Sequence, residues 1–336
     1  MIDQLEIVGF KCFNNETLNV APLTLLSGLN SSGKSSFIQA LRLLKEGGAL
    51  AGYGSLADLK SRAHASFKIC ARKDNVHFGL EYTGSGQLNN LNKKVAFFPP
   101  LFSFISASRF GPQSSLPIYP GDNLLSVGER GEYVIDFFER NYELSGLSPM
   151  LRMAGPETSS VRQNITAWLN VISPGVTFDT KIDRMADMGR TEYGGFRASN
   201  VGFGLSYTLP IIVNILIYSA LIESNKHNSA IILIENPEAH LHPSGQTKIG
   251  EMLARAAACG IQIIVETHSD HLLNGVRLAV KDGLLRAKDS VFYYFAHNFE
   301  EDYTSIETPT IDEFGMFDEW PNGFFDESEK NLGRLL

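Results

Sequence analysis

The residues with the clearest chemical meaning are 28–36, which read Gly-Leu-Asn-Ser-Ser-Gly-Lys-Ser-Ser. They satisfy the pattern G-x-x-x-x-G-K-[ST], which is typical of a loop that binds nucleotide phosphates. Glycines let backbone N–H groups curl around a phosphate, and a following helix offers its positive end to the same anion. Lys34 is expected to reach the β- and γ-phosphates, and the Ser35 hydroxyl is expected to join a Mg²⁺ shell. The predicted ATP-binding residues of this loop are Gly28, Asn30, Ser31, Ser32, Gly33, Lys34, Ser35 and Ser36.

The residues around this loop predict the elements that such a site needs. The apolar run 23–26 indicates a buried strand immediately before the loop. Residues 37–44 carry apolar side chains three to four positions apart, which indicates a helix immediately after it. Strand, phosphate loop and helix therefore follow one another in the required order, and we predict nucleotide binding.

Two later strands end in residues that suit the other half of a nucleotide site. The run 231–234 is apolar and ends in Glu235, at the position of a Walker B carboxylate that helps to hold Mg²⁺. The next run, 261–265, is followed closely by His268, whose neutral side chain can contact a γ-phosphate. An ordinary solvated acid at residue 235 is the alternative, and the phosphate loop upstream argues against it.

Histidine pairs in the same region admit a zinc site as an alternative. His240 and His242 are spaced as ligands can be, and so are His268 and His271. Zinc is the weaker interpretation because these residues already have places in an ATPase motif set.

A second glycine-containing helix start lies at residues 199–208, which read Ser-Asn-Val-Gly-Phe-Gly-Leu-Ser-Tyr-Thr. Gly202 and Gly204 at a helix N-terminus predict another anion-binding nest. A chain with two such nests, more than 160 residues apart, has a use for the second if it faces a neighbouring subunit's nucleotide. A glycine-rich helix start without a ligand is the alternative.

Composition describes an ordinary folded protein of 336 residues, with 43% apolar and 20% charged residues, long enough for one large domain or two smaller ones. The N-terminus lacks the basic region of a secretory signal, and three widely spaced cysteines support neither disulfides nor a zinc cage. The most apolar run, 209–222, has 14 residues and is expected to be a buried helix, because it is too short to span a bilayer. We therefore expect a cytoplasmic protein without membrane association.

The charge is unevenly distributed. The whole chain carries −8, and residues 300–330 alone hold eleven acids and one lysine. Residues 58–94 hold seven bases and three acids, which suits either contact with a nucleic-acid backbone or a solvated face. The acidic segment also contains Phe314, Phe317, Trp320, Phe324 and Phe325, which is too aromatic for a solvated tail. This predicts that the segment either completes the core or forms a docking surface for a basic partner.

Patterns elsewhere predict further elements. Residues 5–13 resemble a strand that enters a turn, and residues 67–82 alternate as in a hairpin with its turn at Asp74 and Asn75. Residues 231–265 alternate strand, helix and strand, as a parallel α/β sheet requires. A strand is also expected at 102–107, and helices at 133–138 and 161–172.

With these motifs in this order, the chain resembles the ABC-type ATPases of the SMC, RecF and overcoming-lysogenisation-defect group. Within it, the chain is similar to short bacterial AAA ATPases that carry a small C-terminal domain of unknown function. The residues that carry this likeness are the Phe-Lys-x-Phe start, the phosphate loop, Ala107-x-Arg109-x-Gly111-Pro112, Asn200-Val201-Gly202-Phe203-Gly204, Glu235-x-Pro237-Glu238-x-His240-Leu241-His242-Pro243, Glu266-Thr267-His268-Ser269 and Trp320-Pro321-x-Gly323-Phe324-Phe325-Asp326.

The resemblance implies an α/β fold of the ABC type, with a mixed β-sheet, an antiparallel β subdomain and a helical insert. Heptad repeats are absent from the sequence, so no coiled-coil arms are expected. The implied domains are an ATPase domain at 1–285 and a small acidic, aromatic domain at 286–336. Within the first, the phosphate loop occupies 28–35, the signature 200–206 and Walker B 231–238, with His268 as the switch histidine.

The resemblance also assigns roles to single residues. Ser35 and Glu235 would hold Mg²⁺, and His268 would sense the γ-phosphate. Many group members have a glutamate where this chain has Asn236, which can position water but cannot accept its proton. Glu238 is the nearest substitute base, so slow or partner-triggered hydrolysis is expected. The signature residues Asn200, Gly202, Gly204 and Ser206 would cap the ATP of the other subunit in a homodimer or higher oligomer.

The implied function is control of a separate protein. Only 68 residues follow His268, and they hold no nuclease domain like that of the overcoming-lysogenisation-defect enzymes. Similar bacterial ATPases are often paired with a separate nuclease or toxin in anti-phage defence, which is an analogy of fold. A RecF-like DNA-binding repair ATPase and a nucleotide-gated scaffold with negligible turnover are the alternatives.

Overall fold

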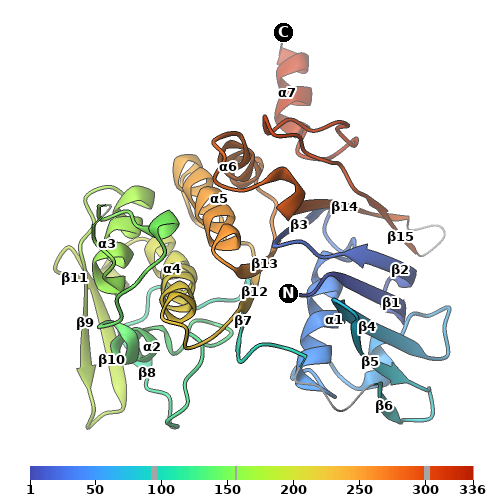
Figure 1. Cartoon of the computed structure of the whole chain (residues 1–336), viewed down its shortest axis with the longest axis horizontal. Helices are drawn as coiled ribbons and strands as arrows, with labels where there is room; N and C mark the ends of the chain where they lie inside the picture. Colours follow the sequence, from blue (N-terminus) through green and yellow to red (C-terminus); the bar gives the residue numbers. More distant parts are fainter. Residues whose placement is uncertain (92–96, 156, 299–302, 336) are drawn as a thin grey trace. The chain divides into compact units, whose positions relative to one another are not determined.

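The computed structural model describes residues 1–91, 97–155, 157–298 and 303–335, and it divides into two compact units (Figure 1). Unit 1 contains residues 1–98, 290–312 and 317–336, and unit 2 contains residues 99–289 and 313–316. Each unit is therefore built from segments that are far apart in the sequence.

Unit 1 contains an antiparallel sheet in the order β2-β1-β4-β5-β6. The expected N-terminal strand and turn are present, with the turn at Lys11, and the expected hairpin pairs Phe67 with Tyr82 and turns at Asp74. Alternate side chains of β1 and β4 are buried, as their patterns predict. The strands are β1 (Gln4–Phe10), β2 (Phe13–Asn19), β4 (Phe67–Lys73), β5 (Val76–Tyr82) and β6 (Leu88–Leu91), and a 3₁₀ helix, η1, spans Leu56–Leu59.

Unit 1 also holds the predicted strand and helix around the phosphate loop. Strand β3 (Leu23–Gly28) is followed by helix α1 (Lys34–Glu46). β3 pairs in parallel with β14 (Ser290–Asn298), which pairs with the antiparallel β15 (Tyr303–Glu307). The C-terminal segment of the chain thus supplies the strand beside the phosphate-loop strand.

The acidic C-terminal segment folds onto β14 through aromatic contacts. Phe324 is fully buried, and its ring lies 6.0 Å from that of Tyr294 and 5.4 Å from those of Phe317 and Trp320. Trp320 remains 42% exposed, and the described residues of helix α7 (Glu327–Leu335) are exposed. The core alternative therefore holds for Phe324. Glu300, Glu301 and Asp302 of the acidic segment, and Lys93 and Lys94 of the basic one, lie outside the described residues.

Unit 2 contains three parallel strands in the order β13-β12-β7. They are almost wholly buried, because apolar runs of this kind are covered on both faces. Helices α5 and α6 pack side by side after β12 and β13 (Figure 1). The elements are β7 (Leu101–Ile105), β12 (Ala230–Glu235), α5 (Pro243–Ala258), β13 (Ile261–Glu266) and α6 (Asp270–Lys281).

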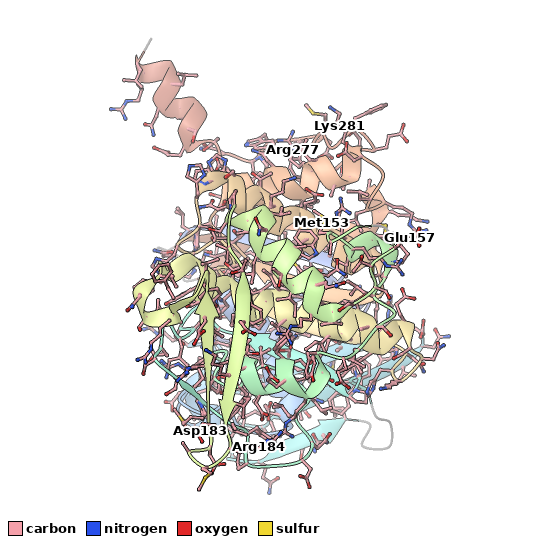
Figure 2. All side chains as sticks on the ribbon, turned by 90° about the vertical axis from the view of Figure 1, so that its left-hand side faces the viewer. Met153, Glu157, Asp183, Arg184, Arg277 and Lys281 are labelled. Carbon is pink, nitrogen blue, oxygen red and sulfur yellow. The ribbon has the colours of Figure 1, made fainter. Side chains whose placement is uncertain are left out.

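The rest of unit 2 is a helical and β insert between β7 and β12. Strands β9 and β10 form a hairpin, and Figure 2 shows Asp183 and Arg184 where β9 turns toward β10. The elements of the insert are β8 (Leu116–Pro117), α2 (Val134–Asn141), α3 (Val161–Ile172), β9 (Phe178–Asp183), β10 (Met188–Tyr193), β11 (Phe196–Arg197) and α4 (Phe203–Glu223), with 3₁₀ helices at Pro149–Leu151 and Ala198–Asn200. A further 3₁₀ helix, Ala287–Asp289, follows α6.

Helix α4 is longer than the apolar run predicted. It has 21 residues and is long and apolar enough to cross a membrane, so the expectation that this segment is too short was wrong. Of its most apolar window, 78% is buried inside the structure. A helix that is hydrophobic on all sides is typical of a protein core, and the expected buried helix is confirmed by this burial.

Candidate functional site

The phosphate loop has a backbone that only glycine fits at two positions. Gly28 has φ 136°, and a Cβ there would lie 2.1 Å from the Phe295 carbonyl oxygen. Gly33 has φ 113°, and a Cβ there would lie 2.8 Å from the Cys12 sulfur. These angles are strained for any residue with a side chain. The loop can therefore keep its curled form only with glycine at both positions.

Lys34 is buried at the start of α1, with 3% of its surface exposed. Its ammonium group donates hydrogen bonds to the carbonyl oxygens of Gly28, at 3.0 Å, and Leu29, at 2.7 Å. A buried lysine is costly unless a partner compensates its charge. The side chain thus lies across the loop, where an anion would pair with it.

Two further observations indicate that the loop suits a phosphate group. Helix α1 begins at Lys34, with Gly33 as its N-cap and no side chain that caps it, so its positive end faces the loop. The buried Ser32 hydroxyl has no hydrogen-bond partner among the described residues. The positive end of a helix and an orphaned hydroxyl beside a lysine suit the binding of a phosphate group.

Residues of the C-terminal segment hold the phosphate loop through hydrogen bonds. The Thr304 hydroxyl donates a 2.9 Å hydrogen bond to the Ser32 carbonyl oxygen, and Thr304 is 2% exposed. The Ser27 hydroxyl donates a 3.0 Å hydrogen bond to the Tyr293 carbonyl oxygen. Sequence analysis missed Thr304, because a threonine in an acidic segment gives no signal for contact with a distant loop.

In unit 2, the ends of three parallel strands bring chemical groups together. Ile105 of β7 lies beside Ile234 of β12, and Glu235 lies beside Glu266 of β13. The segments that follow these strands therefore start at one edge of the sheet, which is where open α/β sheets bind ligands. They contain the predicted residues Glu235, Asn236, Glu238 and His268, and also Arg109.

Glu235 lies half-buried at the end of β12. Its Oε2 accepts a 3.0 Å hydrogen bond from the backbone N–H of Ala107, just after β7. The contact fixes one carboxylate oxygen toward the neighbouring strand end. A carboxylate held in this way suits a Mg²⁺ ligand.

Glu238 is 9% exposed and accepts a 2.8 Å hydrogen bond on Oε1 from the backbone N–H of His268. Burial raises the pKa of this carboxyl above its usual value, against the opposing effects of the His268 N–H and the Arg109 charge. A raised pKa at a buried carboxyl among polar groups is typical of a general acid or base.

Arg109 joins the strand ends. It is 2% exposed and donates 2.7 Å hydrogen bonds to the carbonyl oxygens of Ser106, Glu235 and Asn236. Burial lowers its pKa to about 10, and the charge of Glu238 opposes this shift. The guanidinium remains charged at neutral pH. The motif around residues 107–112 was noted in the sequence, but it gave no role for this residue.

The signature residues differ in exposure and packing. Gly202 is exposed, and a Cβ there would meet open space. Gly204 is close-packed, since a Cβ there would lie 2.9 Å from the His240 carbonyl oxygen. Asn200 is exposed, whereas Ser206 is half-buried within α4. Asn200 and Gly202 are therefore the signature residues most accessible to another molecule.

The histidines considered for zinc have other contacts. The His240 ring packs 4.6 Å from Tyr207 and 5.2 Å from Phe203, and His242 caps α5 by accepting from the Ser244 N–H. His268 is exposed just beyond β13. These positions give the first two histidines packing and capping roles.

The predicted site residues fall into two groups. Residues 28–36 share unit 1, whereas residues 200–206, 235–238 and 268 share unit 2. Within unit 1 the structure brings the loop together with Cys12 and Thr304, and within unit 2 it brings Glu238 together with His268 and Arg109.

Family profiles match most of the chain. The profile of the AAA ATPase domain matches residues 1–88 and 157–273, and a profile described as a protein of unknown function (DUF3696) matches residues 285–335. A search of curated proteins gives no match to this chain.

Solved structures are similar in fold at low sequence identity. An SMC head bound to the C-winged helix domain of ScpA is 12% identical, with a TM-score of 0.56, over 93% of this chain and 98% of that one. The SMC head domain from Thermotoga maritima is 12% identical, with a TM-score of 0.50, over 91% and 98%. RecF, a recombination mediator protein of the RecFOR pathway, is 11% identical, with a TM-score of 0.51, over 91% and 98%.

These likenesses confirm the fold class that the motif order predicted. This chain belongs to the AAA ATPase domain family, has the ABC-type P-loop fold of SMC heads and RecF, and carries a C-terminal domain of unknown function.

Proposed function

We propose that the protein binds MgATP at residues 28–36 and hydrolyses it slowly. The observation that carries this proposal is the buried Lys34 ammonium group, which crosses a loop closed by two glycines at an uncapped helix start. The loop backbone and the other predicted loop residues would hold the phosphates. Membership of an ATPase family agrees with this role.

The residues predicted for hydrolysis are mostly those that follow the strands of unit 2. Ser35 and Glu235 would hold Mg²⁺, which neutralises charge that develops on the phosphates. Glu238 would accept the proton of the attacking water, and Asn236 would orient that water. His268 would contact the γ-phosphate. Because Asn236 cannot accept a proton as the glutamate of many group members does, turnover is expected to be slow without a partner.

The exposed signature residues support assembly around nucleotide. Asn200 and Gly202 are exposed beside the start of α4, where a second subunit's nucleotide can approach them. We propose a homodimer or higher oligomer in which residues 200–206 cap the neighbour's ATP. The division of the chain at residues 285 and 286 into an ATPase domain and a C-terminal domain likewise remains a prediction.

The output of the protein is proposed to be control of a separate effector, a nuclease or toxin, in cytoplasmic anti-phage defence. Support comes from an SMC head that is bound to a ScpA domain, since it shows this fold engaging a separate protein. The likeness to RecF supports equally a DNA-binding repair ATPase, and β4 carries the exposed Arg72 and the half-buried Lys68 and Lys73, which suit contact with a nucleic-acid backbone.

Nucleotide binding is tested with Lys34→Ala against Lys226→Ala, which removes an exposed lysine. We expect Lys34→Ala to lose ATP affinity at least about tenfold, since a charge-assisted contact is worth about 1.5–3 kcal/mol, and the control to bind normally. Unchanged affinity and turnover in Lys34→Ala would contradict the loop assignment.

Asn236→Glu supplies a carboxylate at the water-positioning residue and should raise turnover, despite the left-handed backbone there at φ 45°.

The effector and repair alternatives are separated by steady-state ATPase rates. If the protein encoded by the gene next to that of this chain stimulates the ATPase rate and DNA does not, the result supports effector control. Stimulation by DNA alone supports the RecF-like alternative, and negligible turnover under every condition supports the scaffold.

A further inference from the structure

Arg109 has no role in the proposed chemistry, yet it is the best-bonded buried charge at the strand ends. We propose that Arg109 is a positioning residue that couples the start of helix α4 to the loop that carries Glu238. The proposal rests on the proposed function, because Glu238 matters for turnover only if ATP is hydrolysed here.

The first part of the coupling is a set of backbone contacts. One guanidinium nitrogen of Arg109 donates to the carbonyl oxygens of Ser106 and Glu235, and the other donates to that of Asn236, all at 2.7 Å. Because the guanidinium is planar and rigid, these three bonds fix the end of β7 relative to the end of β12. A movement of Arg109 therefore moves the start of the loop.

The loop that it holds is strained. Between β12 and α5, Asn236 has φ 45° and His240 has φ 63°, both in the left-handed region that residues with side chains rarely adopt. Such conformations persist where surrounding contacts determine them, and they cluster at switch regions. Glu238 lies between these two residues, so its position depends on the contacts that hold them.

The second part is aromatic packing onto α4. The Arg109 guanidinium lies 5.3 Å from the ring centre of Tyr207, in the second turn of α4. The Tyr207 ring in turn lies edge-on to His240 at 4.6 Å, and Phe203 lies 5.2 Å from the same histidine. Tyr207 thus contacts both Arg109 and His240, and His240 lies at the far end of the strained loop.

A purely stabilising role does not fit the burial of these charges. Arg109 Nε and Glu238 Oε2 are both buried without a hydrogen-bond partner among the described residues. Buried charged groups that leave a polar atom without a hydrogen bond stabilise a protein poorly compared with apolar residues of similar size. The arrangement instead suits a conformational change, in which a displacement of α4 changes the position of Glu238 through the contacts of Tyr207 and Arg109.

The experiment compares Arg109→Lys, Tyr207→Leu and the double variant with wild type. The matched control is Arg130→Lys, an exposed arginine whose guanidinium lies 4.0 Å from the Phe110 ring and donates to the Ser108 carbonyl oxygen. Tyr207→Phe keeps the ring and serves as the conservative variant. Two quantities are measured on the full chain: amide hydrogen exchange at Asn236 and His268, and single-turnover ATP hydrolysis.

We expect Arg109→Lys to speed exchange at both amides by about tenfold or more, because the His268 N–H is protected by Glu238 and the Asn236 N–H by Glu266. Hydrolysis should fall by about 100-fold with affinity for a non-hydrolysable ATP analogue within about threefold of wild type. Tyr207→Leu should show the same changes more weakly. The double variant should resemble Arg109→Lys alone, since the two residues act on one loop.

An unchanged exchange rate at His268 in Arg109→Lys overturns the proposal. Effects of the two substitutions that multiply in the double variant also overturn it.

If Arg109→Lys does not fold, the Tyr207 variants decide. Exchange at His268 must then be faster in Tyr207→Leu and stay at the wild-type rate in Tyr207→Phe. An unchanged rate in Tyr207→Leu, or a faster rate in Tyr207→Phe, overturns the proposal. A wild-type protein that does not bind or hydrolyse ATP contradicts the proposed function, whereas the exchange measurements still decide the coupling.

Discussion

The carboxylate of Glu238 accepts a 2.8 Å hydrogen bond from the backbone N–H of His268, which joins the segments that follow two neighbouring parallel strands. The acid proposed as base and the histidine proposed as γ-phosphate sensor are thereby held in one arrangement. A change in the position of His268 must change the surroundings of the Glu238 carboxylate.

Glu238→Gln should lower turnover by about 100-fold, because an amide cannot accept a proton from water. It should also change the dependence of stability on pH. Burial raises the folded-state pKa of Glu238, so its contribution to stability is full below the ordinary value of 4.5 and is lost as pH rises through the raised value. The difference in Tm between Glu238→Gln and wild type should therefore grow in favour of the variant across that window.

Thermal unfolding from pH 4 to pH 8 checks this expectation, with the exposed Glu313→Gln as control. If Tm depends on pH in the same way in wild type and Glu238→Gln, burial does not raise the pKa of the Glu238 carboxyl. Normal turnover of Glu238→Gln would place the base elsewhere.

Gly202→Ala and Gly204→Ala should separate the two signature glycines. A methyl group at Gly204 meets the His240 carbonyl oxygen at 2.9 Å, so we expect a loss of about 1–3 kcal/mol in unfolding free energy. A methyl group at Gly202 meets open space and should leave stability nearly unchanged. Denaturant unfolding of both variants gives the comparison, and equal stabilities would contradict the packing at Gly204.

Assembly is therefore better tested at Gly202 than at Gly204. Gly202→Asp places a carboxylate on the exposed signature without disturbing the His240 backbone, and it should block ATP-dependent association while monomer ATP affinity persists. Light scattering with and without ATP measures this. Normal ATP-driven dimers of Gly202→Asp would rule out the proposed role of the signature.

Thr304→Val should weaken ATP binding about two- to tenfold, since it removes one hydrogen bond, worth about 0.5–1.5 kcal/mol, from the Ser32 carbonyl oxygen. Valine has the same shape, so the loss concerns the hydroxyl alone. Thr308→Val, on the exposed part of the same segment, is the control. Titration with a fluorescent ATP analogue measures both, and equal affinities would mean that Thr304 does not hold the loop.

Phe324→Ala should destabilise the protein by about 3–5 kcal/mol, because it empties a fully buried aromatic site. Trp320→Ala should cost less, because that side chain is 42% exposed. If Trp320→Ala folds and hydrolyses ATP but no longer co-purifies with the neighbouring gene product, Trp320 belongs to a docking surface. If Trp320→Ala loses more stability than Phe324→Ala, Trp320 rather than Phe324 is the main core residue of this segment.

Local patterns predicted the elements whose signals lie within a short stretch of sequence. Helix α3 begins at Val161 and ends at Ile172 as its spacing indicated, and the phosphate loop lies between the expected strand and helix. The pairing of β14 with β3 was not predicted, because a strand's sequence does not identify a partner hundreds of residues away. Hairpin β9–β10 was missed because its alternation is mostly polar.

The candidate site divides in the same way. Lys34, Glu235 and His268 were predicted because each belongs to a motif with fixed spacing. The burial of Arg109 was not, because an arginine in a polar loop is usually solvated, and only the fold shows that three carbonyl oxygens surround it.

The pairing of β3 with β14 has a consequence for synthesis of the protein on the ribosome. Ser27 and Tyr293, which share a hydrogen bond, are 266 positions apart, so the phosphate loop lacks its neighbouring strand until most of the chain has been translated. At roughly 5–20 residues per second, that interval lasts on the order of 10–50 seconds. A nascent chain with Lys34 already made should therefore bind ATP weakly, and tight binding should arise only when the C-terminal residues emerge.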